Sequence, residues 1–191
     1  MTVVFEEVSV SNGVIDHKHT VEELINLSYA GKEYELLEGQ FVEMPGPSIK
    51  HGAIIITLGQ YLNGYATQQR VGAVMSNTAF VLDRDNAPRP DVAFVLQARL
   101  QGVDYDDAFP GRPDLAVEVV SRTDLVYDVA DKIALYLRFE VPLVWLIEPR
   151  SKLVFVYHPG SNKPLVLGVD DELDGETLLA GFKLKVSTLF E

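Results

Sequence analysis

The sequence predicts an α/β protein, in which a central mixed β-sheet is flanked by helices. Three segments carry apolar residues at helical spacing, and short apolar runs bounded by turn residues lie between and after them. The resulting order (helix, hairpin, helix, three strands, helix, further strands) is typical of a sheet with helices packed on it. Since a chain of 191 residues suits one domain, we expect a single domain over residues 1–191, with roughly the first 15 residues peripheral.

The N-terminal part predicts a helix and then a hairpin. Thr20 and Glu23 have the spacing of a capping box in front of an apolar run, so a helix of about three turns should begin there. Residues 33–44, EYELLEGQFVEM, alternate in polarity and carry Glu38-Gly39 at their middle. This pattern indicates a hairpin that turns at Glu38-Gly39.

The middle of the chain predicts a long helix followed by strands. From Lys50 to about Arg70, apolar residues recur at helical spacing, which indicates a helix that faces the core. After Gly72 the pattern changes to apolar runs separated by turn residues. These runs predict three strands, at residues 73–83, 90–97 and 114–121.

The C-terminal part predicts a third helix and more strands. Residues 123–140 return to helical spacing, and Pro142 closes this helix. The next two apolar runs are separated by Arg150-Ser151 and indicate a hairpin. Residues 175–191 should end the chain with further short strands.

Composition excludes several kinds of site. The chain has no cysteine, which rules out disulfides, thiolate zinc sites and a cysteine nucleophile. It has no apolar run near the roughly 18 residues of a membrane helix, and its first residues lack the pattern of a secretory signal. We therefore expect a cytoplasmic protein without a membrane partner.

The formal net charge of −12 bears on any nucleic-acid hypothesis. Proteins that bind nucleic acid usually present a basic surface, because binding releases counterions from the phosphates. Local basic patches and a bound divalent cation can reverse the sign of the field at a site. Any nucleic-acid hypothesis for this chain therefore requires such a local feature.

Glu118 is an unusual residue for its place in the sequence. In DLAVEVV, residues 114–120, successive side chains point to opposite faces of the strand, and Glu118 has apolar neighbours on both faces. A carboxylate in such a setting must be paired, protonated or bound to a metal, because an isolated buried charge is very costly. A structural ion pair is the simplest explanation, and a metal site is the alternative.

Asp91 heads the preceding predicted strand, which we expect to lie beside the strand of Glu118. Two carboxylates on adjoining strands can share Mg²⁺, which prefers oxygen ligands. Alternatively, Asp91 is a turn residue that bonds nearby backbone amides. Asp114 lies about 13 Å along the strand from Glu118, at roughly 3.3 Å per residue, and should not share the same ion.

Lys132 belongs to a stripe on the third predicted helix. Asp128, Lys132 and Tyr136 are spaced four apart, so they share one face of that helix. A helix that directly follows the Glu118 strand can fold this stripe over the sheet and bring an ammonium group to a scissile phosphate. The alternative is a surface pair of Asp128 and Lys132, which would stabilise the helix by only a few tenths of a kcal/mol.

The series of motifs resembles a known family. It consists of YELLEG, a following His51, RPDVAFV, PDLAVEVVS, the D-x-x-x-K-x-x-x-Y stripe and VPLVWLIEP, in that order over residues 34–149. This series is similar to the Uma-two-type endonucleases, members of the PD-(D/E)XK restriction-endonuclease-like superfamily. The resemblance implies a single-domain restriction-endonuclease-like fold and hydrolysis of phosphodiester bonds in DNA.

The resemblance also implies roles for particular residues. Asp91 and Glu118 are the expected catalytic acids that bind Mg²⁺ or Mn²⁺, and Glu35 of the early hairpin is a further expected metal contact. The superfamily's lysine should stand two residues after the second acid, where this chain has Val120, so Lys132 is the expected catalytic lysine.

Four more residues match the family as possible supporting residues of the site: His51, Ser121, Asp128 and Tyr136. For His51, capping or packing at a helix start is an equally good explanation, and Ser121 is alternatively a turn residue. Asp114 is expected to be a strand-entry feature.

Two classes of function compete. The first is a metal-dependent endonuclease, for which a homodimer is plausible because a duplex has two strands to cut. The second is a catalytically inactive member of the fold that acts as a protein-binding or regulatory module, which the net charge and the acidic segment VDYDDAF favour. A third possibility, a small phosphoester substrate, lacks the support of a Gly-rich phosphate loop.

Overall fold

The fold is built on a six-stranded mixed sheet. The structure is a computed structural model, and it describes residues 18–29, 33–44, 46, 48–121, 126–161 and 163–191. The strands lie in the order β10-β9-β8-β7-β5-β3. Their bounds are β3 Gly72–Met75, β5 Val92–Leu96, β7 Leu115–Val119, β8 Leu143–Glu148, β9 Leu153–Tyr157 and β10 Leu165–Leu167. Only β7 and β8 are parallel within this sheet, so the predicted mixed sheet is confirmed.

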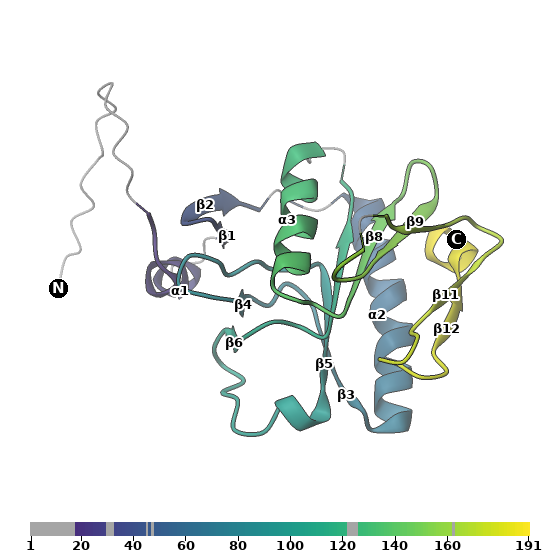
Figure 1. Ribbon diagram of the computed structural model, residues 1–191, viewed down its shortest axis with the longest axis horizontal. Helices are drawn as coiled ribbons and strands as arrows, with labels where there is room; N and C mark the ends of the chain where they lie inside the picture. Colours follow the sequence, from purple (N-terminus) through teal and green to yellow (C-terminus); the bar gives the residue numbers. More distant parts are fainter. Residues whose placement is uncertain (1–17, 30–32, 45, 47, 122–125, 162) are drawn as a thin grey trace.

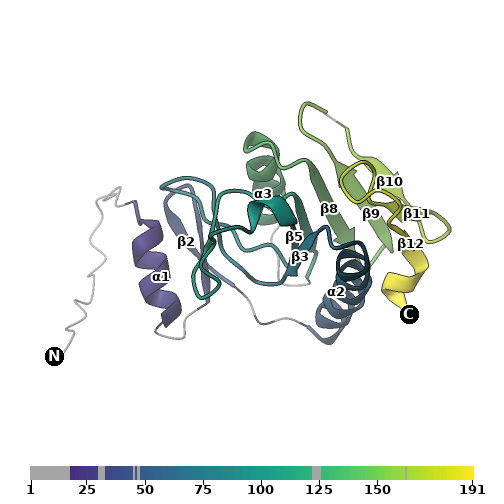
Figure 2. The ribbon, with the colours of Figure 1, turned by 90° about the horizontal axis from the view of Figure 1, so that it is seen from below.

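Two helices cover opposite faces of this sheet, α2 (Ile49–Gln69) and α3 (Val126–Arg138) (Figures 1 and 2). Alternation along β7 divides its side chains between them. Leu115, Val117 and Val119 pack into the core under α2. Ala116 packs with α3, so Glu118, which has the same parity, also points to the α3 side. The predicted alternation of side chains between the two faces of this strand is therefore confirmed.

A small N-terminal layer lies beside the sheet and consists of α1 (Val21–Tyr29), β1 (Tyr34–Leu37) and β2 (Gln40–Glu43) (Figure 1). The predicted capping box is present, because Thr20 Oγ1 accepts from the Glu23 amide and Glu23 Oε2 accepts from the Thr20 amide. The predicted hairpin is confirmed, and both of its turn residues have positive φ. Backbone hydrogen bonds between Leu36 and Ala87 tie β1 to the rest of the protein.

The prediction of one strand over residues 73–83 is wrong in part. The chain leaves the sheet after β3, and β4 (Phe80–Val81) pairs instead with β6 (Phe109–Pro110) in a separate parallel ladder. Asn77, with φ of 57°, makes the bend between β3 and β4. The exit places Phe80 against Phe109, with 5.2 Å between ring centroids, where both rings cover Ala93 and Val95 of β5.

The remaining segments complete the fold. The predicted hairpin of β8 and β9 is confirmed. The C-terminal part contains β11 (Glu172–Asp174), β12 (Lys183–Lys185) and a 3₁₀ turn, η2 (Val186–Phe190), while another, η1 (Gln97–Arg99), follows β5. The predicted start of the third helix at residues 123–125 and the predicted peripheral N-terminus lie outside the described residues. Within the described parts, the helices are too short or too polar to cross a bilayer.

Candidate functional site

Asp91 and Glu118 lie across from each other on neighbouring strands. The antiparallel register pairs Val92 with Val117, so Asp91, one residue before β5, stands opposite Glu118. Asp91 Oδ2 accepts a hydrogen bond of 2.7 Å from the amide of Val119 and lies 3.1 Å from Nε2 of His51 at the start of α2. Its carboxylate therefore bonds to the backbone of β7, so Asp91 is not simply a turn residue that bonds nearby backbone amides.

Glu118 meets the stripe of α3. Nζ of Lys132 lies 2.8 Å from Glu118 Oε1, and the hydroxyl of Tyr136 donates to the same oxygen at 2.7 Å. Glu118 and Lys132 are 7% and 8% exposed and Tyr136 is fully buried, so Lys132 is not the surface pair considered as its alternative. The fold of α3 over the sheet, which the stripe predicted, is confirmed for these two residues.

Glu35 completes the surroundings of the ammonium group. Its Oε2 lies 3.1 Å from Nζ of Lys132 and accepts a hydrogen bond of 3.1 Å from the amide of Arg89. Lys132 also donates to the carbonyl oxygen of Arg89 at 3.4 Å. The hairpin of β1 and β2 thus contributes a carboxylate to a cluster whose other acids come from the central sheet.

Among the residues that the structure describes, the cluster has three acidic side chains and one ammonium group. Burial, together with the neighbouring carboxylates of Asp91 and Glu35, raises the pKa of Glu118 to about 8, although Lys132 lowers it. The pKa of Lys132 is also raised, because Glu118 and Glu35 outweigh the effect of burial. Burial and the charge of Glu118 raise the pKa of the Tyr136 hydroxyl, which therefore remains a donor.

These oxygen donors suit a hard divalent cation to which the protein supplies only a few ligands. The described acids outnumber the ammonium group, a divalent ion would compensate this excess of acid and release the proton that Glu118 holds, and all the donors are oxygen. Within the part of the chain that the structure describes, no three His, Asp or Glu side chains converge closely enough to share one ion. The fit is therefore to an ion held by one or two carboxylates, with water and substrate oxygen supplying the rest.

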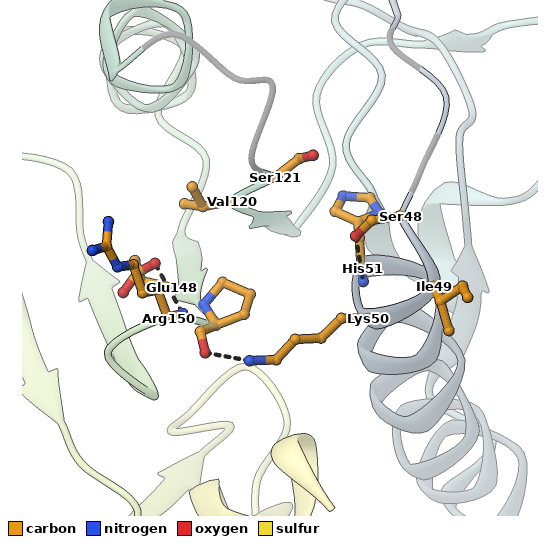
Figure 3. Close-up of a pocket in the computed structure, with 9 residues that line it drawn as sticks. Ser48, Ile49, Lys50, His51, Val120, Ser121, Glu148 and Arg150 are labelled. Atoms are coloured by element: carbon orange, nitrogen blue, oxygen red, sulfur yellow. Dashed lines mark hydrogen bonds between the residues drawn. The ribbon is translucent and has the colours of Figure 1, made fainter.

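A groove of about 990 Å³ opens beside the acids (Figure 3). The start of α2 forms one side, the turn between β8 and β9 forms the other, and the end of the Glu118 strand lies between them. Its lining residues are Ser48, Ile49, Lys50, His51, Val120, Ser121, Glu148, Pro149 and Arg150. His51 joins the groove to the acid cluster, because it lines the former and contacts Asp91 in the latter.

Sequence reasoning brought some of these residues together and missed others. Ser121 lies in the groove rather than in the acid cluster, and the side chain of Asp128 lies outside the described residues. Arg89, Lys50 and Arg150 were missed. Arg89 acts through its backbone, which no residue pattern reveals, whereas the position of Lys50 beside His51 was an available signal.

The second Arg-Pro-Asp has a different environment from the first. Asp114 is 3% exposed, pairs with Arg99 at 2.9 Å and Arg112 at 3.6 Å, and accepts from the amide of Leu96. These contacts join the entrance of β7 to the end of β5. The expectation that Asp114 is a strand-entry residue agrees with this geometry.

Comparisons with known proteins show the family and the fold of the chain. The chain matches the Uma2 family, described as "Putative restriction endonuclease", over residues 21–187. It is also similar to the crystal structure of a "putative nuclease belonging to DUF820" from Anabaena variabilis, with a TM-score of 0.78 and 23% identity over 90% of this chain and 97% of the other. No curated protein matches the chain. The structural match confirms the predicted restriction-endonuclease-like fold.

Proposed function

We propose that this chain, which belongs to the Uma2 family, hydrolyses phosphodiester bonds of DNA with the help of a bound Mg²⁺ or Mn²⁺ ion. The family description supports a nuclease-like function, and the metal and the substrate are the finer parts of the proposal. The observation that carries them is the arrangement of Asp91, Glu118 and Lys132, in which two carboxylates on paired strands share their surroundings with a buried ammonium group.

In this proposal each residue of the site has its own role. Asp91 and Glu118 hold the ion, whose chemistry when bound is to polarise the scissile phosphate and to lower the pKa of a water. Lys132 stabilises the negative charge that builds up on the phosphate oxygens during attack, because its ammonium is held beside Glu118 in a poorly solvated setting. His51 fixes the carboxylate of Asp91 through their contact of 3.1 Å.

Glu35 has two candidate roles in this proposal. It was expected to be a metal contact, and its present contacts favour a positioning role for the ammonium of Lys132 and for the backbone of Arg89. Tyr136 likewise orients Glu118. Ser121 belongs to the substrate groove in this proposal.

The test measures cleavage and ion binding on the same samples. Supercoiled plasmid and single-stranded DNA are incubated with the protein in Mg²⁺, Mn²⁺ or EDTA, and Mn²⁺ binding is followed by calorimetry. We expect metal-dependent cleavage and Mn²⁺ binding by the wild type, and the loss of both in Glu118→Ala and Glu118→Gln. Glu176→Gln, which changes an exposed carboxylate paired with His158, is the matched control and should behave as the wild type. Retention of both properties in the Glu118 variants would refute the assignment.

One observation favours the second class of function, a catalytically inactive module that binds a protein or regulates one. The ammonium of Lys132 lies between Glu35 and Glu118 at 3.1 and 2.8 Å, so a cation already neutralises part of the cluster. In a protein of this class, Mn²⁺ would not bind, Lys132 would serve only to stabilise the fold, and Glu118→Gln would leave the oligonucleotide affinity of the protein unchanged.

Further expectations stay predictions. They are a single nuclease-like domain over residues 1–191, a cytoplasmic location and a homodimer. Light scattering of the purified protein, alone and with a duplex oligonucleotide, tests the homodimer directly.

A further inference from the structure

The groove beside the acid cluster differs in charge from the rest of the protein. The whole chain has a formal net charge of −12. Among the residues that the structure describes, the groove is lined by two cationic side chains, Lys50 and Arg150, and by one acid, Glu148. Its balance is therefore positive in a protein that is otherwise strongly acidic.

Glu148, the acid among these lining residues, accepts hydrogen bonds from the turn that carries it. Glu148 Oε1 accepts from the amide of Arg150 at 3.0 Å, and Oε2 accepts from both the amide and the hydroxyl of Ser151. Each oxygen of the carboxylate thus has a donor within the turn between β8 and β9. Its negative charge is partly compensated there, which reduces the repulsion of an anion in the groove.

The stretch of sequence that supplies the opposite wall contains no acid. From Met44 to Leu82 the chain contains neither Asp nor Glu, although it has 28 such residues in total. This stretch covers the whole of α2 and β3. A polyanion can therefore approach the sheet along α2 without meeting a carboxylate from that segment.

Lys50 is held in place at the groove. Its Nζ donates to the carbonyl oxygen of Pro149 at 2.6 Å, a contact that spans the groove from the start of α2 to the β8–β9 turn (Figure 3). The ammonium retains two further donors for a ligand. Arg150, on the same turn, is exposed and offers a guanidinium, which suits phosphate oxygens.

We propose that this groove binds the sugar-phosphate backbone of a nucleic-acid strand next to the phosphate that is cut, with Lys50 and Arg150 as its phosphate contacts. The inference rests on the proposed function for the position of the bound strand relative to the phosphate that is cut, since His51 joins the groove to Asp91. The groove would also be the local basic feature that a nuclease with a net charge of −12 requires.

The experiment measures binding without cleavage. Fluorescein-labelled oligonucleotides, single-stranded and duplex, DNA and RNA, are titrated with the full chain in EDTA, and the anisotropy is followed over a series of salt concentrations. The variants are Lys50→Ala, Arg150→Ala and the double variant. The matched control is the double variant Arg84→Ala with Lys185→Ala, which removes the same charge from exposed residues that do not line the groove.

For the strand that binds, we expect each groove substitution to weaken affinity several-fold and to reduce the slope of log K against log salt by about 0.7 to 0.9. The control variant should keep the wild-type slope. The comparison of DNA with RNA and of single strands with duplex identifies which backbone the groove accepts.

The outcomes separate this inference from the proposed function. If the groove variants bind like the control, or if the wild type binds no oligonucleotide, the groove assignment is overturned, even where plasmid cleavage persists. If the groove variants lose affinity but the wild type does not cleave in Mg²⁺ or Mn²⁺, the groove assignment stands and the catalytic proposal fails. Melting temperatures of all variants are compared, and a groove variant counts only where it unfolds as the wild type does.

Discussion

Tyr136 donates a hydrogen bond of 2.7 Å to Oε1 of Glu118, and Nζ of Lys132 lies 2.8 Å from the same oxygen. One carboxylate oxygen therefore receives two donors from α3. Because both donors come from one helix turn, they fix the rotation of the Glu118 side chain relative to β7. An ion bound by Glu118 would then find its ligand already oriented.

Tyr136→Phe should lower kcat with little effect on KM for DNA. The change removes a hydrogen bond to an acidic group, worth about 1.5–3 kcal/mol, which corresponds to a loss of roughly tenfold to a hundredfold. Mn²⁺ affinity should fall as well, since the carboxylate loses its orientation. Tyr65→Phe, which removes a hydroxyl bonded to the carbonyl oxygen of Ala180, is the control for loss of a tyrosine hydroxyl. Equal kcat in the two variants would contradict a positioning role for Tyr136.

Lys132→Ala should abolish cleavage and also destabilise the fold. Removing one partner of a buried ion pair costs about 3–5 kcal/mol, because the remaining carboxylates of Glu35 and Glu118 lose their compensation. Urea denaturation measures this cost. Added Mn²⁺ should raise the stability of Lys132→Ala more than that of the wild type, since the ion replaces part of the missing positive charge. If Mn²⁺ stabilises neither protein, the ion does not bind beside Lys132.

Stability should fall with rising pH through the titration of Glu118. Its pKa is raised from 4.5 to about 8 in the folded state, so between these values the folded protein holds a proton that the unfolded chain has released. The free energy of unfolding then decreases as pH rises across that window. Glu118→Gln lacks this group, and urea denaturation from pH 5 to 8 without metal should show a smaller decrease for the variant. Parallel profiles would contradict the raised pKa.

The two Arg-Pro-Asp motifs should respond differently to the same substitution. Asp91→Asn should retain the fold and lose Mn²⁺ affinity and cleavage. Asp114→Asn should lose about 2 kcal/mol or more of stability, since it weakens a buried acid's pairing with Arg99 and Arg112, and should retain Mn²⁺ affinity. Calorimetry and thermal unfolding of both variants check the contrast. Loss of Mn²⁺ affinity in Asp114→Asn, measured below its melting temperature, would mean that the two motifs share one site.

Local patterns predicted most of the helices and strands because their signals lie within a few residues. The capping box of Thr20 and Glu23 and the turn at Glu38-Gly39 are such signals, and the structure contains both. The run from residue 73 to 83 misled the same reasoning. Its apolar residues serve two different layers, and the partner of Phe80 is Phe109, about thirty residues later. A periodicity of two cannot distinguish a long strand from two short ones that pair elsewhere.

The sequence by itself determined which residues carry charge where a core is expected. Glu118 among apolar neighbours and Lys132 on a helical stripe could be identified without coordinates, because alternation and helical spacing fix the face on which a side chain lies. Only the tertiary structure decided which charges meet. Contacts such as Glu35 with Lys132, or Lys50 with Pro149, join segments about a hundred residues apart, and they depend on how the hairpin, the sheet and the two helices pack. Burial in that packing also sets the pKa of Glu118, since the cost of a charge depends on its surroundings rather than on its residue type.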